Sequence, residues 1–156
     1  MPQFSSKSST ALNTAETDLI IIFNEVIRYF DCSVIYGNRS QMEQWELYKK
    51  GRAYNNNTLQ WEIVDQSRVV TYKDGTINLS NHNYSPSRAV DVTPYPINWK
   101  DVNRLYLFAG YVLGVASRLK QEGHILHNIR WGGDWDRDTL VLDETFLDLV
   151  HFEIII

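Results

Sequence analysis

Hydrophobic positions recur every three or four residues in two long segments of the chain. The first segment covers residues 14–30, where Asn13 followed by Glu16 has the pattern of a helix start. The second covers residues 99–121, and Gly123 is well placed to end it. Its apolar positions are Val102, Leu105, Phe108, Val112, Val115 and Leu119. The pattern therefore predicts two amphipathic helices.

Shorter patterns surround these helices. A brief amphipathic stretch before Gly51 predicts a helix over residues 41–50. The Asn-rich residues 54–68 are interpreted as loop, and the Ser/Thr-rich residues 1–12 are expected to be loosely ordered. Short runs rich in β-branched and aromatic residues predict strands over 32–36, 69–72, 89–92, 129–131 and 149–156.

Helices and short strands do not alternate regularly along this chain. This order favours an α+β fold over a doubly wound parallel sheet. The chain has 156 residues, the size of one ordinary domain, and contains no internal repeat or low-complexity linker. We therefore expect residues 1–156 to form a single domain.

Charge and composition narrow the possible partners. The chain is 44% hydrophobic, so it can bury a substantial core, and its formal net charge is -4. Its fifteen Lys and Arg residues are scattered rather than clustered. Because binding to nucleic acid or to an anionic membrane needs concentrated positive charge, we expect neither partner. We expect the protein to act as a monomer.

Cysteine content and the first residues indicate the compartment. Cys32 is the only cysteine, which excludes an intrachain disulfide and a cysteine-based zinc cluster. The first eighteen residues lack the apolar region of a secretory signal peptide. The apolar run Leu19–Phe23 is too short to span a bilayer. We therefore expect a chain made in the cytoplasm without a signal peptide and without membrane insertion.

The histidines offer a candidate metal site. A hydrolytic zinc site uses three protein ligands and keeps one position open. His82 precedes Asp91 by nine residues, and His151 lies in the last predicted strand. Two ligands from one segment and a third from a rigid strand would form a suitable trio. His124 and His127, which follow the long helix, are interpreted as structural or solvent-facing.

Each member of this trio also has an ordinary structural interpretation. His82 has the neighbours of a surface residue, and Asp91 could be a strand residue that faces solvent. His151 could be a hydrogen-bonded core histidine. The sequence contains no His-Glu-x-x-His motif, so the best-known signature of zinc peptidases is absent.

Four sequence blocks, in a consistent order between about residue 31 and residue 156, resemble one enzyme family. SNHNYSPSRAVDVTPYPINW resembles the zinc-binding motif of the D-Ala-D-Ala carboxypeptidases and phage L-alanyl-D-glutamate peptidases. DLVHFEI resembles the second motif of that family, in which a carboxylate precedes a zinc histidine by three residues. RWGGDWDRD and IYGNRSQMEQWELYKKGRA are similar to its glycine–tryptophan and arginine segments.

The resemblance implies a small α+β domain whose antiparallel sheet carries a zinc ion held by His82, Asp91 and His151. The sequence departs from the commonest form of the first motif. That form separates its His and Asp by seven residues with a Gly between them, whereas here the separation is nine and Ser85-Pro86-Ser87 replaces the Gly. This longer form of the motif, which contains proline, resembles the form found in phage endolysins.

The resemblance also implies roles for residues around the metal. Asp148 would be the general base, and it must lie in the turn before the last strand to share a site with His151. Arg39 would support the developing oxyanion. Glu153, two residues after His151, would orient that histidine or face solvent. Residues 131–135 would form a substrate wall or part of the core.

Three functions remain open from the sequence. The leading hypothesis is a zinc-dependent peptidoglycan peptidase of the phage endolysin type, which cleaves the L-alanyl-D-glutamate bond and reaches the cell wall after release. The first alternative is a D-Ala-D-Ala carboxypeptidase or dipeptidase of cell-wall metabolism. The second is a non-catalytic, metal-stabilised binding module. Asp148 and Arg39 beside a full zinc trio favour an enzyme over such a module.

Overall fold

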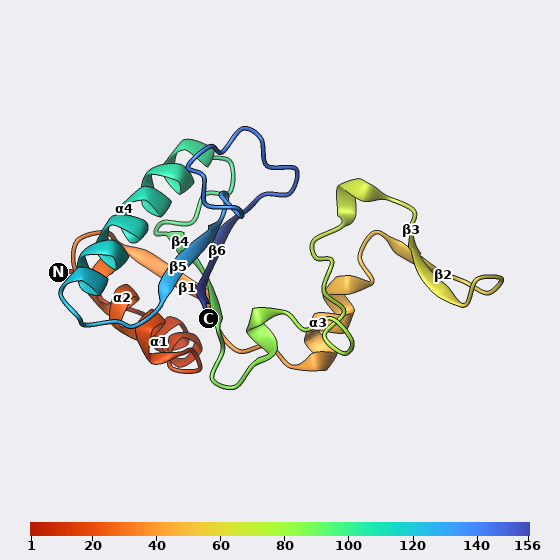
Figure 1. Cartoon of the computed structure of the whole chain (residues 1–156), viewed down its shortest axis with the longest axis horizontal. Helices are drawn as coiled ribbons and strands as arrows, with labels where there is room; N and C mark the ends of the chain where they lie inside the picture. Colours follow the sequence, from red (N-terminus) through yellow and green to blue (C-terminus); the bar gives the residue numbers. More distant parts are fainter.

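The computed structural model describes all 156 residues and contains one four-stranded antiparallel sheet with helices on one of its faces (Figure 1). The strands lie in the spatial order β1 (Cys32–Tyr36), β4 (Ala89–Pro94), β6 (Asp148–Ile155) and β5 (Asn128–Gly132). The helices packed against them are α1 (Ser6–Leu12), α2 (Thr17–Val26) and α4 (Val102–Gln121). This arrangement confirms the α+β expectation.

The two central strands separate a core face from a polar face. Val90, Val92 and Phe152 point to the helices and are fully buried in the hydrophobic core. Asp91 and His151 alternate with them, so both project from the opposite face. The two residues are direct cross-strand partners in the β4–β6 pair. Strand alternation and register therefore bring two of the expected metal ligands together.

The N-terminal region corrects two expectations. Residues 1–12 include helix α1, because the Ser5 hydroxyl accepts a hydrogen bond from Ser8 N at 3.2 Å and caps the helix. The buried Ser8 hydroxyl in turn accepts from Val34 N at 3.1 Å, which ties α1 to the edge strand β1. The helix predicted over 14–30 is shorter, since α2 ends at Val26 and continues only as turns.

The chain segment that connects β1 to β4 forms a separate arm, which projects from the sheet (Figure 1). It contains helix α3 (Gln41–Tyr48) and the hairpin of β2 (Arg52–Asn55) and β3 (Gln60–Ile63). Two 3-10 turns follow, η1 (Gln66–Arg68) and η2 (Asn81–Asn83).

The arm contradicts two further predictions. Residues 54–68 are not simply loop, because they complete the hairpin. In this hairpin the ring centroids of Tyr54 and Trp61 lie 5.8 Å apart. Trp45 of α3 contacts Trp61 at 5.7 Å, so the arm has a small aromatic cluster of its own. The strand predicted over 69–72 does not form, and Thr71 instead accepts side-chain hydrogen bonds from the arm.

The remaining predicted elements are found with small shifts in their ends. Strand β4 extends two residues beyond Val92, and β5 and β6 begin one residue earlier than predicted. Helix α4 starts after Asp101, whose side chain accepts a hydrogen bond from Arg104 N at 3.2 Å. None of the helices combines the length and the apolar character that crossing a membrane requires.

Candidate active site

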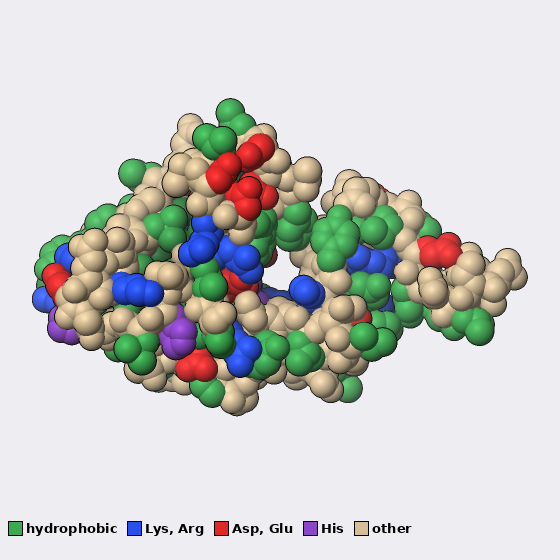
Figure 2. All heavy atoms as spheres, viewed as in Figure 1, with side chains coloured by type: hydrophobic (Ala, Val, Ile, Leu, Met, Phe, Trp, Pro, Cys, Tyr) green, Lys and Arg blue, Asp and Glu red, His purple; other side chains and the backbone are tan.

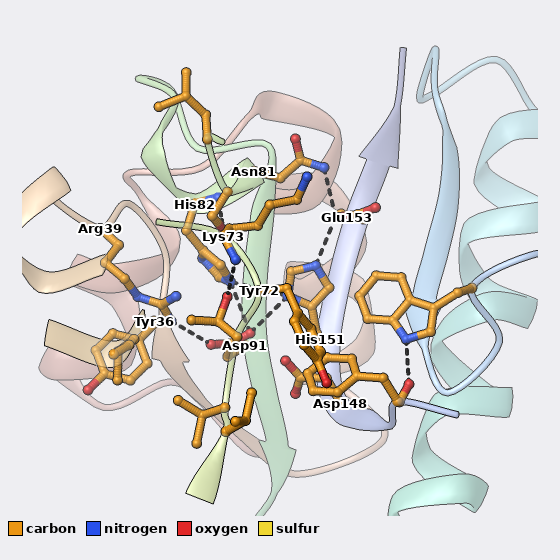
Figure 3. Close-up of a pocket in the computed structure, with 18 of the residues that line it drawn as sticks. Tyr36, Arg39, Tyr72, Lys73, Asn81, His82, Asp91, Asp148, His151 and Glu153 are labelled. Carbon is orange, nitrogen blue, oxygen red and sulfur yellow. Dashed lines mark hydrogen bonds and ion pairs between the residues drawn. The ribbon is translucent and has the colours of Figure 1, made fainter. Parts of the chain in front are cut away.

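Three buried side chains converge on one point at the polar face of the sheet (Figure 3). His82 Nε2 lies 3.1 Å from Asp91 Oδ1 and 3.2 Å from His151 Nδ1. His151 Nδ1 lies 3.2 Å from Asp91 Oδ1, which completes a nearly equilateral triangle. The structure thus brings together all three residues that the sequence suggests as metal ligands, despite the longer spacing between His82 and Asp91.

The third ligand comes from η2 rather than from the sheet. The Ser80 hydroxyl caps this turn and accepts a hydrogen bond from His82 N at 3.3 Å. His82 O accepts from Arg39 N at 2.8 Å, which attaches η2 to the chain that leaves β1. The His82 ring is 2% exposed, so neighbouring groups hold it in one orientation.

Hydrogen bonding fixes which ring nitrogens face the centre of the triangle. His82 Nδ1 lies 2.7 Å from Gly37 O, a carbonyl that can only accept, so this nitrogen carries the proton. His151 Nε2 lies 2.9 Å from the Glu153 carboxylate and is protonated for the same reason. If both rings are neutral, the two nitrogens that face Asp91 are lone-pair donors. Such an arrangement is suited to binding a cation.

The spacing of these atoms fits a small tetrahedral metal ion. Ligand atoms about 2.0 Å from a zinc ion at tetrahedral angles would lie roughly 3.3 Å apart. The three observed separations are 3.1, 3.2 and 3.2 Å. Two imidazoles and one carboxylate are also a common ligand set of hydrolytic zinc sites. The residues present therefore fit a metal of this kind.

The electrostatics of the site agree with a positive charge at its centre. Burial alone would raise the pKa of Asp91, yet His82 and His151 hold it far below its usual range. Burial would lower the pKa of His151, but hydrogen bonds with Asp91 and Glu153 raise it to about 10. Both shifts favour positive charge among these three side chains.

Glu153 anchors the ring of His151 from behind. Its Oε2 also accepts a hydrogen bond from Asn81 Nδ2 at 2.7 Å, and its Oε1 accepts from Arg130 Nε at 2.8 Å. Burial would raise the pKa of Glu153, but hydrogen bonds from His151, Asn81 and Arg130 lower it to about 2. Of the two interpretations from sequence, the structure supports the one in which Glu153 orients the histidine.

Arg39 lies directly against the ligand Asp91. Its Nη2 donates to Asp91 Oδ2 at 3.1 Å, and its Nη1 donates to Gln44 Oε1 at 2.9 Å. The Tyr36 ring lies 4.9 Å from the guanidinium carbon. Arg39 is 8% exposed, and its Nε makes no hydrogen bond. The arginine is thus fixed beside the candidate metal position by its two Nη groups, and its buried Nε remains without a partner.

Asp148 is the first residue of β6 and not part of a preceding turn, which corrects the expected placement. The β5–β6 register is irregular between Trp131 and Gly132, so Asp148 pairs with Gly132 and the strict alternation of an ideal strand does not apply. A Cβ at Gly132 would overlap the Asp148 carbonyl oxygen. The absence of a side chain at residue 132 therefore allows Asp148 to reach the site.

The environment of Asp148 favours retention of a proton. Burial and the negative charge of Asp91 raise its pKa, and the nearby His151, His82 and Arg39 partly oppose this shift. The side chain lines the same cleft as the three candidate ligands. Its carboxyl group is therefore a titratable group at the candidate reaction centre that is not one of the three metal-facing donors.

The site opens into a cleft of about 670 Å³ between the sheet and the arm. Figure 2 shows the hollow between the two parts, with charged side chains at its edge. Trp135 lies 5.4 Å from the His151 ring, and Tyr72 of the arm meets Phe146 at 5.5 Å. Trp135 therefore contributes to the wall expected from residues 131–135, whereas Trp131 is 4% exposed and belongs to the core.

Four residues around the site were missed in the sequence. Gln44, Asn81 and Arg130 hold Arg39 or Glu153 in place, and Lys73 lines the cleft. Arg130 could have been suspected, because it is the first residue of the glycine–tryptophan segment and lies in the strand predicted over 129–131. Gln44 carries no comparable signal, since its importance comes from its complete burial in a helix whose other residues are not buried.

The other two histidines lie outside the site, as the sequence predicts. His127 Nδ1 lies 2.8 Å from the Asp18 carboxylate, which joins the connection between α4 and β5 to α2. The His124 side chain is 61% exposed, 3.6 Å from Glu122. Neither histidine lines the cleft that contains the candidate ligands.

A candidate His–Asp–His centre on an antiparallel sheet, with a further carboxylate and an arginine beside it, is the arrangement expected of a metal-dependent hydrolase. The family profile of the phage L-alanyl-D-glutamate peptidases matches residues 1–155. The chain belongs to this family. It is therefore a peptidase that acts on peptidoglycan, which confirms the enzyme over the non-catalytic module.

A solved structure supports the same fold. It is described as the Serratia marcescens L-Ala D-Glu endopeptidase ChiX and has 23% sequence identity and a TM-score of 0.56 to this chain. The similarity covers 98% of this chain and 90% of that one. No curated protein matches the chain significantly.

Proposed function

We propose that the protein is a zinc-dependent endopeptidase that cleaves the bond between L-alanine and D-glutamate in the peptidoglycan stem peptide. The observation that carries the zinc assignment is the triangle formed by His82 Nε2, Asp91 Oδ1 and His151 Nδ1, with sides of 3.1–3.2 Å. The choice of bond follows from the family to which the chain belongs. The three residues would hold the ion and leave one position open toward the cleft.

A zinc ion held there would polarise the scissile carbonyl and lower the pKa of the attacking water. Asp148 is the proposed general base. Its carboxylate would take one proton from the water as the new carbon–oxygen bond forms. It would then pass that proton to the nitrogen of D-glutamate as the carbon–nitrogen bond breaks. A raised pKa suits a carboxyl group that must hold a proton between these two steps.

Arg39 has two proposed tasks. Its hydrogen bond to Asp91 Oδ2 directs the other oxygen of that carboxylate to the metal position. Its guanidinium provides a fixed positive charge beside the candidate metal position for the oxyanion that develops on the scissile carbonyl. Because guanidinium remains protonated throughout, Arg39 would contribute charge and geometry without exchanging a proton.

The experiment is to incubate the zinc-loaded protein with purified stem peptides and to identify the new chain ends by mass spectrometry. We expect a new amino terminus at D-glutamate, no cleavage after chelation, and recovery when zinc is added back. Release of D-alanine with the L-Ala–D-Glu bond intact would favour the carboxypeptidase alternative. Size-exclusion chromatography of the same sample tests the proposed monomer.

A further inference from the structure

Lys73 lies at the cleft on the arm side, opposite the strands that carry the candidate ligands. It lines the same cleft as His82, Asp91 and His151. Figure 3 shows its side chain pointing toward the Asn81 side of the cleft. The side chain is exposed, so it can reach a molecule bound in the cleft without a change in the core.

A chain of hydrogen bonds fixes Lys73 relative to the candidate metal position. Asp91 accepts from Arg39 at 3.1 Å, and Arg39 donates to Gln44 at 2.9 Å. Gln44 Nε2 then donates to the backbone oxygen of Lys73 at 2.8 Å. Gln44 is completely buried, so it cannot exchange these partners for water. The backbone of Lys73 is thus connected through three hydrogen bonds to a candidate metal ligand.

The turn after Lys73 is held in one conformation. The Asp74 carboxylate accepts from the backbone nitrogens of Thr76, Ile77 and Asn78 at 2.7–3.0 Å. Gly75 has φ +80°, and a Cβ there would lie 2.8 Å from Gln44. This position therefore requires glycine, and the turn packs closely on the glutamine that holds Lys73. The position of Lys73 is a feature of the fold and not that of a free surface loop.

The arginines of the cleft are held in ion pairs, whereas the Lys73 side chain is free to bind a ligand. Arg39 is paired with Asp91, and Arg130 is paired with Glu153. Neither Lys73 nor Lys50, the two other basic residues of the cleft, forms an ion pair. Lys50 follows helix α3 and lacks the hydrogen-bonded connection to Asp91. Lys73 is therefore the cation best placed to bind an anionic group of the substrate near the reaction centre.

The substrate that corresponds to this family's bond has an anionic group close to the scissile bond. When the nitrogen of a D-glutamyl residue is in the scissile bond, only one of its two carboxyl groups continues the chain. The other is free, within a few bonds of the nitrogen that leaves. We propose that Lys73 binds this free carboxylate and makes the enzyme prefer stem peptides in which it is not amidated. The inference rests on the proposed function, because it assumes cleavage between L-alanine and D-glutamate.

The test compares two synthetic stem peptides that differ only in this group, a free carboxylate in one and a primary amide in the other. We expect the wild type to cleave the acidic peptide with a kcat/KM on the order of tenfold higher, as suits a charged but solvent-exposed hydrogen bond. In Lys73→Gln the ratio of the two kcat/KM values should fall to about one. Lys73→Arg should retain most of the preference.

Two matched variants complete the experiment. Lys50→Gln removes the other unpaired cation of the cleft, and Lys100→Gln removes an exposed lysine outside it. Both should keep the wild-type ratio. Equal cleavage of the two peptides by the wild type, or a ratio that Lys50→Gln abolishes and Lys73→Gln retains, would overturn the inference. A wild type that cleaves neither peptide at the L-Ala–D-Glu bond would instead refute the proposed function.

Discussion

His151 and Glu153 stand two residues apart on β6, and the Nε2–H of the histidine donates to the carboxylate at 2.9 Å. This hydrogen bond turns Nδ1 toward Asp91 and His82. The carboxylate is itself held by Arg130 and Asn81, so the orientation of the metal-facing nitrogen is fixed by residues from three segments of the chain. The candidate ligand is thus positioned by its neighbours as well as by its strand.

We therefore predict that Glu153→Ala weakens zinc binding by about 10- to 100-fold, the usual effect of losing a group that orients a metal ligand. Competition with a chromophoric chelator measures the affinity. Glu122→Ala is a suitable control, because this glutamate lies beside the exposed His124 and far from the cleft. Equal zinc affinities in the two variants would remove Glu153 from the support of the site.

Asp148→Asn should keep zinc and the fold but reduce turnover by roughly 100- to 10,000-fold. The two side chains are nearly the same size, but the amide cannot accept the proton from water. Zinc content and stem-peptide cleavage are measured on the same preparation. Asp143→Asn, at an exposed position in the preceding loop, should leave turnover unchanged. A zinc-loaded Asp148→Asn with near-wild-type rates would exclude the proposed base.

Gly132→Ala should lower both turnover and stability, because its new Cβ would overlap the carbonyl oxygen of Asp148. Overpacking against backbone costs about 1–3 kcal/mol in the free energy of unfolding. Gly110→Ala provides the opposite case, since a Cβ at Gly110 in helix α4 meets nothing within 4 Å. That variant should be stabilised by roughly 0.5–1 kcal/mol. Denaturant unfolding and peptide cleavage of both variants distinguish the two effects.

Asp18 should make stability depend on pH. Burial alone would raise its pKa, but hydrogen bonds from Leu126 N, His127 N and the His127 ring lower it. A carboxylate with a lowered pKa stabilises the fold above its unfolded pKa, and this contribution is lost as pH falls through the folded value.

We predict that Asp18→Asn costs about 1.5–3 kcal/mol in the free energy of unfolding at neutral pH, the range for hydrogen bonds to a charged group. Its deficit relative to the wild type should shrink as the pH falls below about 4, near the ordinary pKa of aspartate. Thermal unfolding monitored by circular dichroism across this range provides the measurement. A deficit that stays constant with pH would show that the charge of Asp18 is not responsible.

The sequence predicts the strands at the site because their residues alternate. Val90, Asp91 and Val92 divide between core and cleft as the period of a strand requires, and the same applies to His151 and Phe152. The arm was harder to predict, because its hairpin depends on aromatic contacts between residues of α3, β2 and β3 rather than on burial in the main core.

The residues of the site also divide into those that the sequence could predict and those that it could not. The identity of the three metal-facing residues could be taken from motifs, but the placement of Asp148 could not. It depends on the irregular pairing of β5 with β6, which no periodic pattern encodes. Gln44 was missed for a related reason. Its role follows from its contact with Arg39 and from its hydrogen bond to the backbone oxygen of Lys73, 29 residues further along the chain, where the conformation is set by the fold.

The assignment of His82, Asp91 and His151 as zinc ligands is tested most directly by metal analysis of purified variants. We predict one zinc ion per chain in the wild type and in His124→Ala, whose histidine is exposed and outside the cleft. His151→Ala removes one corner of the triangle, so it should lose most of its zinc while circular dichroism shows that the fold persists. Full zinc occupancy in a folded His151→Ala protein would contradict the assignment.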